Sequence, residues 1–355
     1  LFFKKQNMKK KSLSAKKKIH KKLLNHLRNK KINYIFKEFE RYLDLNVKKN
    51  EKIGVAISGG PDSLALAFIA KCYFLKSKMD NKFFIVDHKL RKDSLKEAKY
   101  VKNFLKDFDI DCSILKWSGK KPKSNIQGIA RNYRYKILRN NCLKFNINNL
   151  LIGHHIDDLY ENFFIRLIRG SGLKGLSSFG EIIKEKKKNF SILRPLIKFE
   201  KKDLIYISKT VFSFFIEDPS NKNLLFTRSR IRKFIYELNK EGFDKKKFNL
   251  TINNLRSANN AINFYVEKNI QDNSKYIKKK NTYILNKFFF LQPQEVVIRS
   301  ISIILNKISH KYYPPRGKSI VDMLKRINLN IFKKLTIGGC CVEKINETML
   351  ITREN

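Results

Sequence analysis

A glycine-rich turn at residues 57–63 is the first segment whose residue types and spacing suggest chemistry. It reads Ile57-Ser58-Gly59-Gly60-Pro61-Asp62-Ser63 and stands between a short apolar run and a longer one. Adjacent glycines let backbone N–H groups approach a phosphate, and a helix that begins at Pro61 would direct its N-terminus at the same anion. Gly60-Pro61 stands where the common P-loop has Lys followed by Ser or Thr. We therefore expect a phosphate-binding loop of another type, made of Ser58, Gly59, Gly60, Pro61, Asp62 and Ser63. The alternative is a plain strand-to-helix turn that Asp62 caps.

Residues 153–161 bring two histidines and three carboxylates together. A short apolar run ends in Gly153-His154-His155, and a helical pattern then begins with Asp157 and Asp158 and places Glu161 one turn further on. Helix capping accounts for one aspartate, but not for three acids beside two histidines. Because Mg²⁺ prefers oxygen ligands, we expect Asp158 and Asp62 to hold Mg²⁺ against a phosphate. His155 is equally well explained as a packed core histidine.

Arginine is scarce in this lysine-rich chain, so its positions are informative. Nine of the 17 arginines lie between residues 131 and 232, where a forked donor for phosphate is a reason to use arginine. Arg131 and Arg134 are three residues apart in a helical pattern and would present two guanidiniums on one face. Arg228, Arg230 and Arg232 alternate, which predicts an extended segment that reaches a nucleotide or an RNA. Solvated basic surface is the alternative for both groups.

The segments that must position these residues alternate between short and long apolar patterns. Short runs at 53–57, 83–86, 114–117 and 150–152 predict strands, and periodic runs at 64–75, 95–105, 129–145 and 159–168 predict helices. This alternation predicts an α/β fold with a doubly wound parallel sheet. Ligands bind such sheets beyond the carboxyl ends of the strands, where residues 58–63, 87–91 and 153–158 fall.

A smaller, mainly helical region follows. Periodic patterns at 230–238, 250–270 and 295–308 predict helices, and residues 335–342 and 349–352 predict a terminal hairpin. Residues 1–37 hold 14 basic residues and no acid, so this arm is a candidate electrostatic tether for RNA. We therefore expect a basic N-terminal arm and helix (1–45), a phosphate-loop domain (46–217) and a helical, RNA-binding domain with a terminal hairpin (218–355).

The charge composition points to a polyanionic partner. The 355 residues carry 77 Lys and Arg against 31 Asp and Glu, a net charge of +46, which favours nucleic acid as a partner. Part of this excess is also explained by AT-rich coding bias. The five cysteines form no C-x-x-C pair, which argues against a zinc or iron–sulfur site, and no apolar run approaches the length that spans a bilayer. The chain is expected to be soluble and cytoplasmic, with no membrane partner.

Ordered motifs make the chain resemble a known family. Ser-Gly-Gly-x-Asp-Ser after a first strand is the signature of N-type ATP pyrophosphatases of the PP-loop superfamily, which cleave ATP between its α- and β-phosphates. Within that superfamily the chain is similar to the tRNA(Ile)-lysidine synthetases from about residue 50 to its end. The motifs that carry this resemblance are Val86–Arg91, Asn125–Tyr135, Gly153–Asp158 with Glu161, Arg169–Leu176, Arg194–Leu196, Asp218–Asn221, Phe226–Arg232 and Leu335–Gly339.

The resemblance implies a ligase that uses ATP and Mg²⁺. The C2 oxygen of the wobble cytidine of tRNA(Ile) with a CAU anticodon would attack the α-phosphate of ATP, and free L-lysine would then displace AMP to give lysidine. The resemblance assigns the reaction centre to Asp62, His154, Asp158, Glu161 and Arg228. It assigns nucleotide binding to the phosphate loop and to Asp87, His88, Arg131 and Arg134. It indicates no oligomeric state.

Two other functions remain open from the sequence. A PP-loop tRNA thiolase would share the phosphate loop but would deliver sulfur through cysteines or an iron–sulfur cluster, and Cys72, Cys112 and Cys142 do not fall at strand ends that face this loop. A catalytically inactive, basic RNA-binding protein is the second alternative. Exchange of ATP and pyrophosphate, stimulated by tRNA, would distinguish an enzyme from such a protein.

Overall fold

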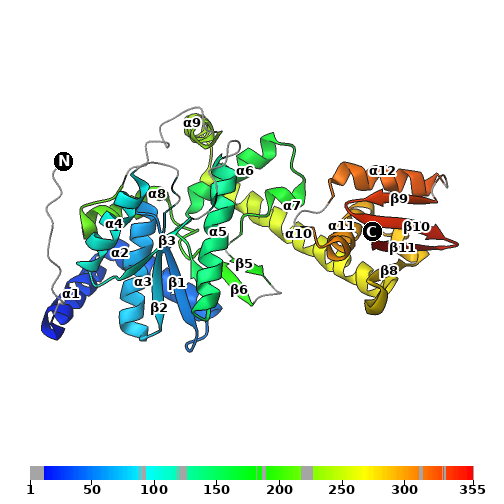
Figure 1. Ribbon diagram of the computed structural model, residues 1–355. Helices are drawn as coiled ribbons and strands as arrows, with labels where there is room; N and C mark the ends of the chain where they lie inside the picture. The colour runs from blue at the N-terminus through cyan, green and yellow to red at the C-terminus, as the bar shows by residue number, and fades with distance from the viewer. Residues whose placement is uncertain are drawn as a thin grey trace. The chain divides into compact units, whose positions relative to one another are not determined.

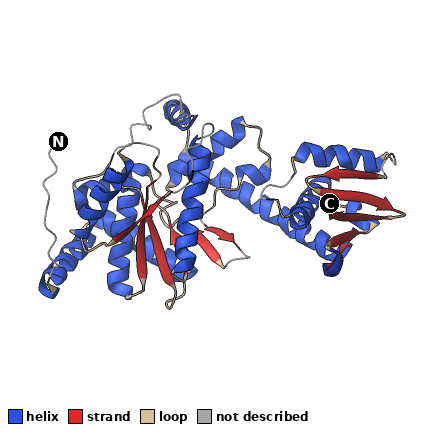
Figure 2. Ribbon diagram, viewed as in Figure 1, coloured by secondary structure: helices blue, strands red, loops and turns tan. Residues whose placement is uncertain are grey.

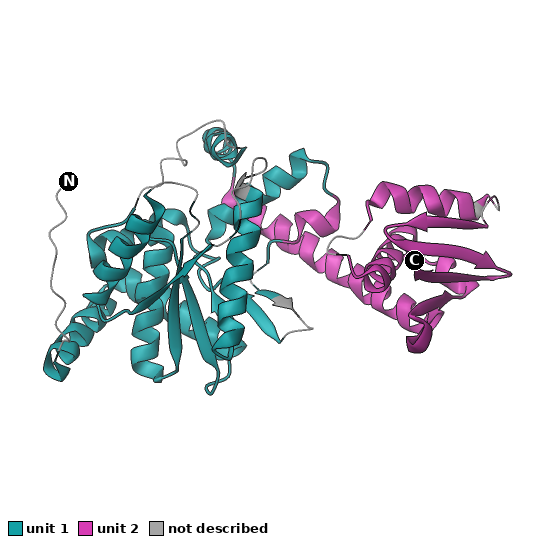
Figure 3. Ribbon diagram, viewed as in Figure 1, with its two compact units in different colours: residues 1–171, 179–243 teal, residues 172–178, 244–355 magenta. Residues whose placement is uncertain are grey.

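The computed structural model describes residues 12–87, 89, 93–117, 119, 126–180, 182–185, 189–216, 227–311, 315–329, 331 and 333–354 of the chain. The chain divides into two compact units, of which unit 1 spans residues 1–171 and 179–243 and unit 2 spans residues 172–178 and 244–355 (Figure 3). We expected the second domain to begin at residue 218. The units divide later because α9 (Thr227–Lys240) packs against α6 (Ile156–Ile168) within unit 1.

Unit 1 is built on a six-stranded sheet with the order β3-β2-β1-β4-β6-β5 (Figures 1 and 2). Its strands are β1 (Lys52–Ile57), β2 (Asn81–Asp87), β3 (Cys112–Lys116), β4 (Ile147–Leu151), β5 (Ile182–Glu185) and β6 (Phe190–Leu193). Neighbouring strands are parallel, except that β5 pairs antiparallel with β6 at one edge. The expected parallel, doubly wound sheet is confirmed. Because β1 lies between β2 and β4, the residues that follow these three strands lie close together at the carboxyl ends of the strands.

The helices of unit 1 position the segments between the strands. They are α1 (Leu13–Asn25), η1 (His26–Arg28), α2 (Lys30–Asn46), α3 (Pro61–Ser77), α4 (Ser94–Lys106), α5 (Ile126–Lys144), α6, α8 (Lys201–Phe212) and α9. Residues 64–70 of α3 are fully buried, as expected for a helix that is apolar on every side. This helix packs against β1 and α8, so the turn that precedes it is anchored to the core.

The N-terminal helices belong to the core of unit 1. Leu23, Ile32 and Phe36 are buried in the same apolar cluster as α3. Asp109 accepts hydrogen bonds from His20 (2.7 Å) and Lys71 (2.9 Å), which joins α1 to α3. Residues 13–46 therefore do not form the separate basic arm that the charge pattern predicted, and residues 1–11 lie outside the described residues.

Unit 2 combines helices with a five-stranded antiparallel sheet of order β7-β8-β11-β10-β9. Its elements are α7 (Leu173–Leu176), α10 (Lys245–Asn273), β7 (Ser274–Ile277), η4 (Lys278–Lys280), β8 (Thr282–Leu285), η5 (Lys287–Leu291), α11 (Gln294–Ser309), α12 (Gly317–Asn328), β9 (Lys334–Ile337), β10 (Cys340–Ile345) and β11 (Thr348–Arg353). The expected hairpin is present as β10 and β11. The sequence pattern did not predict β7 and β8, and it merged β9 with β10 across Gly338 and Gly339, whose φ values of +64° and +82° form a turn.

Candidate active site

The turn between β1 and α3 has the geometry of an anion-binding loop. Gly59 has a φ of +84°, and a Cβ at this position would lie 2.7 Å from Val101, so only glycine fits. Gly60 is the N-cap of α3 and Pro61 stands in its first turn. Ser63 closes the loop, because its Oγ accepts a hydrogen bond from the Ser58 N–H (3.1 Å) and donates to the Gly60 carbonyl (2.9 Å). The loop is thus preformed, with the helix N-terminus open to an anion.

The segment that follows β4 lies directly against this loop. A Cβ on Gly153 would come within 2.8 Å of the Asp62 carbonyl oxygen and 3.2 Å of the Ser63 nitrogen. The backbones of the two segments can approach this closely only because residue 153 has no side chain. Gly153 therefore holds the two histidines that follow it next to the phosphate loop.

His155 lies among three carboxylates. Its Nε2 is 3.6 Å from Oδ2 of Asp62 and 3.5 Å from Oδ2 of Asp158, while its Nδ1 is 3.5 Å from Oδ2 of Asp157. Burial disfavours the charged imidazole, but Asp157, Asp62 and Asp158 together raise the pKa of His155 to about 10. His155 is 1% exposed, so it is packed in the interior as well as charged, and its positive charge lies among the three acids.

The three acids around His155 have separate tasks. Oδ2 of Asp158 accepts a hydrogen bond from the backbone N–H of His155 (3.2 Å) at the start of α6, and Oδ2 of Asp157 accepts one from the backbone N–H of Lys201 (2.8 Å) at the start of α8. Burial opposes ionisation of Asp158, but the charges of His155 and Arg228 and the hydrogen bond from the backbone of His155 lower its pKa below the usual value. Within the described part of the chain, Oδ1 of Asp62 is buried and has no hydrogen-bond partner. Asp62 is therefore the acid that has an oxygen available for a ligand.

Glu161 is one turn further along α6 and pairs with α9. It is 2% exposed and accepts a hydrogen bond from Nε of Arg232 (2.5 Å), while Nε of Arg228 lies 4.0 Å away. Burial raises the pKa of Glu161 above its usual value, although Arg232 opposes this. Arg228, Arg230 and Arg232 lie on the helix α9, so the prediction of an extended segment was wrong. The prediction from alternate spacing failed because Arg228 and Arg232, which are four residues apart, also share one face of a helix.

Several guanidiniums crowd the same region. Burial lowers the pKa of Arg131, and the charges of Arg134, Arg228 and Arg194 lower it further, against the opposing effect of Tyr135. Arg131 and Arg134 both lie over the Tyr135 ring, at 5.2 and 5.6 Å from its centroid. Like charges held this close favour a polyanion between them.

Asp87 is the last residue of β2, and its side chain is buried at the carboxyl end of that strand. Its Oδ1 accepts hydrogen bonds from Ser94 (2.7 Å) and the Lys89 N–H (3.0 Å), and its Oδ2 has no partner among the described residues. His88, Asn125 and residues 218–221 lie outside the described residues, so the roles expected for them stay predictions.

Comparison with known proteins shows the family. Residues 24–239 match the family described as a PP-loop domain. The tRNA(Ile)-lysidine synthase of Wolbachia pipientis wMel is 32% identical over 329 residues, which cover 89% of this chain and 74% of that protein. The enzyme of the same name from Orientia tsutsugamushi (strain Boryong) is 33% identical and covers 86% of this chain and 70% of that protein.

The chain belongs to the tRNA(Ile)-lysidine synthase family. Among solved structures, it shares its fold with the U34-tRNA thiolase NcsA from Methanococcus maripaludis, with a TM-score of 0.52 and 19% identity over 61% of this chain and 75% of that one. The resemblance inferred from the motifs is therefore confirmed at the level of the lysidine synthase family and the PP-loop fold.

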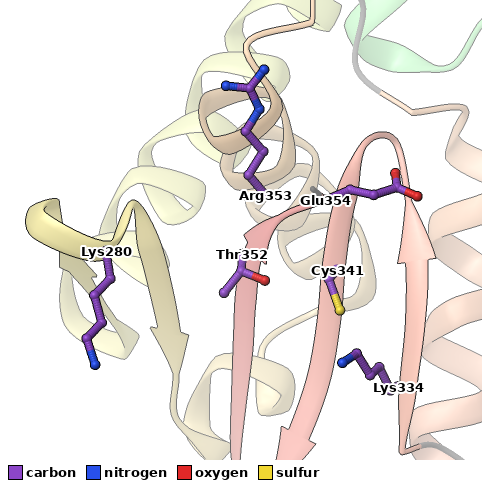
Figure 4. Close-up of a pocket in the computed structure, with 6 residues that line it drawn as sticks. All are labelled: Lys280, Lys334, Cys341, Thr352, Arg353 and Glu354. Carbon is purple, nitrogen blue, oxygen red and sulfur yellow. The ribbon is translucent and has the colours of Figure 1, made fainter.

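In this member of the lysidine synthase family, the candidate active site is the phosphate loop of unit 1 with the acids, histidines and arginines around it. A pocket of about 450 Å³ lies on the sheet of unit 2 (Figure 4). Its lining includes Lys334, Cys341 and Thr352 from the three neighbouring strands β9, β10 and β11. It holds no histidine and a single acid, Glu354, so its lining does not offer comparable chemistry. No described helix of this family member is long and apolar enough to cross a membrane.

Proposed function

We propose that the chain is an ATP-dependent ligase that joins lysine to C2 of the wobble cytidine of tRNA(Ile) with a CAU anticodon. The reaction passes through an adenylated cytidine and yields lysidine, AMP and pyrophosphate. The observation that carries this proposal is the juxtaposition of a preformed phosphate loop, a buried acid cluster and crowded guanidiniums in a lysidine synthase relative. A tRNA substrate makes the cytoplasm the expected compartment.

The phosphate loop and the arginines serve the first step. Backbone N–H groups at the start of α3 hold the nucleotide phosphates, and Arg131 and Arg134 supply forked donors for the departing pyrophosphate. These donors are fixed before substrate binds, so they stabilise developing negative charge without reorganisation. The cytidine oxygen forms the new bond to the α-phosphate as the bond to pyrophosphate breaks.

The acids serve the second step. Free lysine has a pKa of about 10.4, so its amine arrives as an ammonium and must lose a proton before it attacks C2. Asp158 is held ionised by its neighbours, which suits it to bind the ammonium, and Oδ1 of Asp62, which has no hydrogen-bond partner among the described residues, could receive that proton. Glu161 pairs with Arg232 and lies 4.0 Å from Nε of Arg228, so it holds these guanidiniums beside α6.

The residues also fit Mg²⁺. Among the described residues, Oδ1 of Asp62 is a hard oxygen ligand without a hydrogen-bond partner beside the phosphate loop, and Asp158 is a carboxylate that contacts the same Nε2 of His155. Mg²⁺ is usually held by one or two carboxylates together with phosphate oxygens, a set that these two acids and a bound nucleotide would supply. When bound, Mg²⁺ would neutralise phosphate charge during adenylation.

The thiolase alternative is disfavoured by the chemistry of the thiols in unit 1. Burial raises the pKa of Cys72, Cys112 and Cys142 to about 12 in each case, so these thiols are protonated and poorly reactive. A sulfur-transfer reaction needs an accessible thiolate or cluster ligand. The ligase proposal needs neither.

The test is incubation of the full chain with ATP, labelled lysine and a tRNA(Ile) transcript bearing the CAU anticodon, followed by nucleoside analysis. We expect lysine-dependent lysidine and tRNA-stimulated exchange of ATP with pyrophosphate. A transcript with adenosine at the wobble position has no C2 oxygen and serves as the matched control. Absence of both product and exchange would reject the ligase, and sulfur incorporation would favour the thiolase.

A variant of the phosphate loop adds an internal control. Asp62→Asn keeps the size of the side chain but removes its charge, so we expect a normal circular dichroism spectrum and no lysidine. Near-normal turnover in this variant would contradict the assignment of Asp62 to the reaction centre.

A further inference from the structure

Arg194, which directly follows β6, is a buried cation with an ordered set of contacts. It is 2% exposed, and its guanidinium lies 4.3 Å from the centroid of the Phe179 ring. Its Nη1 donates to the Gly180 carbonyl, and its Nε donates to Nδ1 of His154 over 2.9 Å. His154 also packs against Phe179, at 5.3 Å between ring centroids. Arg194 and the aromatic ring thus fix the His154 imidazole from two sides.

The direction of the bond between Arg194 and His154 settles where the imidazole proton lies. A guanidinium has only donors, so Nδ1 of His154 must be the acceptor and carries no proton. A neutral imidazole has one N–H, which must then be on Nε2, and an imidazolium has no lone pair to accept the bond. The geometry therefore assigns His154 as the neutral Nε2–H tautomer.

The surrounding charges act in the same direction. Burial lowers the pKa of His154 well below its usual value, and Arg131, Arg194 and Arg134 lower it further, against the opposing effect of Asp158. His154 therefore stays uncharged at neutral pH. Its neighbour His155 has the opposite state, because three carboxylates surround that ring.

We propose that Arg194 is a positioning residue that locks His154 as a neutral hydrogen-bond donor, whose Nε2–H binds an oxygen of the reacting nucleotide or cytidine and takes no proton from lysine. This inference rests on the proposed ligase function for its substrates. It removes His154 from the candidate bases and leaves proton acceptance to the carboxylates. A donor held in this way is ready for an oxygen on which charge develops.

The tautomer can be measured without any assay of activity. Long-range ¹H–¹⁵N correlation spectra of the full chain with ¹⁵N-labelled histidine distinguish protonated from unprotonated ring nitrogens, and the His154→Gln variant identifies the signals. We expect a protonated Nε2 and a bare Nδ1 at pH 7. A protonated Nδ1 would overturn the proposal. This readout is independent of whether the chain makes lysidine, so its failure is separate from failure of the proposed function.

Ligand titration in the same spectra identifies the oxygen. A shift of the Nε2 signal on addition of a non-hydrolysable ATP analogue with Mg²⁺ would assign a nucleotide oxygen. A shift only on further addition of tRNA would assign an oxygen of the cytidine. No shift with either would overturn donation by His154.

Substitution of His154 tests whether this side chain acts as a donor or as a base. The amide N–H₂ of Gln reaches the position of Nε2, whereas that of Asn reaches only the position of Nδ1. Loss of one preorganised donor lowers kcat by about 10²–10³. We expect His154→Ala and His154→Asn to show such a loss with little change in KM, and His154→Gln to retain at least about tenfold more kcat. Equal losses in all three would overturn the proposal.

Substitution of Arg194 tests the positioning role itself. Arg194→Lys keeps the charge but loses the planar fork that contacts His154, Gly180 and Phe179 together. We expect a mixture of His154 tautomers and a lower kcat at nearly unchanged KM for ATP. A variant that keeps the wild-type spectrum and kcat would show that Arg194 only fills space.

Discussion

Arg232 donates a hydrogen bond from its Nε to Oε1 of Glu161 over 2.5 Å, across 71 positions of sequence. Glu161 is 2% exposed, and this pair joins α9 to α6 at the candidate active site. A buried carboxylate depends on its cationic partner, because removal of one member leaves an unpaired charge. Stability and activity should therefore respond differently when each member is replaced.

Arg232→Met is expected to destabilise unit 1 by about 3–5 kcal/mol, the usual cost of an unpaired buried charge. Urea unfolding of the full chain measures this. Lys233→Met, at an exposed position of the same helix, is the matched control and should change stability by no more than about 0.5 kcal/mol.

Glu161→Gln keeps a hydrogen-bond acceptor, so it should fold but lose at least about a hundredfold in lysidine formation. If Glu161→Gln kept most of its activity, Glu161 would have a structural role only.

Gly153→Ala should damage the site through backbone contact alone. The added methyl group would lie 2.8 Å from the Asp62 carbonyl oxygen, so the phosphate loop or the segment after β4 must move. We expect a loss of about 1–3 kcal/mol in stability and a raised KM for ATP. Gly317→Ala is the control, because no heavy atom lies within 4 Å of its Cβ position. Equal behaviour of the two variants would contradict the close approach.

Asp109 should make the docking of α1 dependent on pH. Burial raises its pKa, but hydrogen bonds from His20 and Lys71 outweigh burial and hold the pKa below the usual value. A carboxyl with a lowered folded pKa stabilises the protein above its unfolded pKa of about 3.9, and this stabilisation is lost as the pH falls through the folded pKa.

The Asp109→Asn variant tests this dependence. We expect it to be less stable than wild type by about 1.5–3 kcal/mol at pH 7, with the difference shrinking below about pH 4. Asp111→Asn is the control, because that side chain is 85% exposed and its nearest cation, Lys102, is 4.0 Å away. A difference that stays constant with pH would contradict the ionic role of Asp109.

The exposed lysines of α1 should contribute to tRNA affinity through phosphates alone. Replacement of Lys17, Lys18 and Lys21 by Gln removes three exposed charges and leaves buried Leu23 in place. We expect weaker tRNA binding, a slope of log affinity against log salt that is shallower by about 2–3, and unchanged product at saturating tRNA. The control is the same replacement of Lys48, Lys49 and Lys52, which lie at the opposite end of β1 from the phosphate loop. Equal slopes in wild type and the α1 variant would exclude the tether.

Local patterns in the sequence predicted the parts of the site that lie on single segments. Asp62 follows a strand and a glycine turn and begins a helix, and Asp158 lies at the start of a helix that follows another strand. The hydrophobic periodicity and the turn residues of these segments predict this arrangement. The parallel sheet then brings these segments together, because β1 and β4 are neighbours. Most of the candidate site could be placed in this way.

Contacts between distant segments could not be predicted. The cationic state of His155 depends on Asp62, which is 93 positions away, and the proton position of His154 depends on Arg194 after β6. The short strands β7 and β8 have four residues each, and they are defined by their pairing with each other and by the pairing of β8 with β11. The arginines of α9 were misassigned because alternation over five residues is compatible with a helix face as well as with a strand.

Residues 172–178 group with unit 2 although the chain on both sides of them belongs to unit 1. The polypeptide therefore passes between the units at 171–172, at 178–179 and at 243–244. A cut after Phe243 would leave α7 covalently joined to unit 1, while α10, the helix that α7 packs against, would be on the other fragment. A fragment ending at residue 243 would likewise carry α7 without the helix it packs against, so neither unit corresponds to one continuous stretch of the chain.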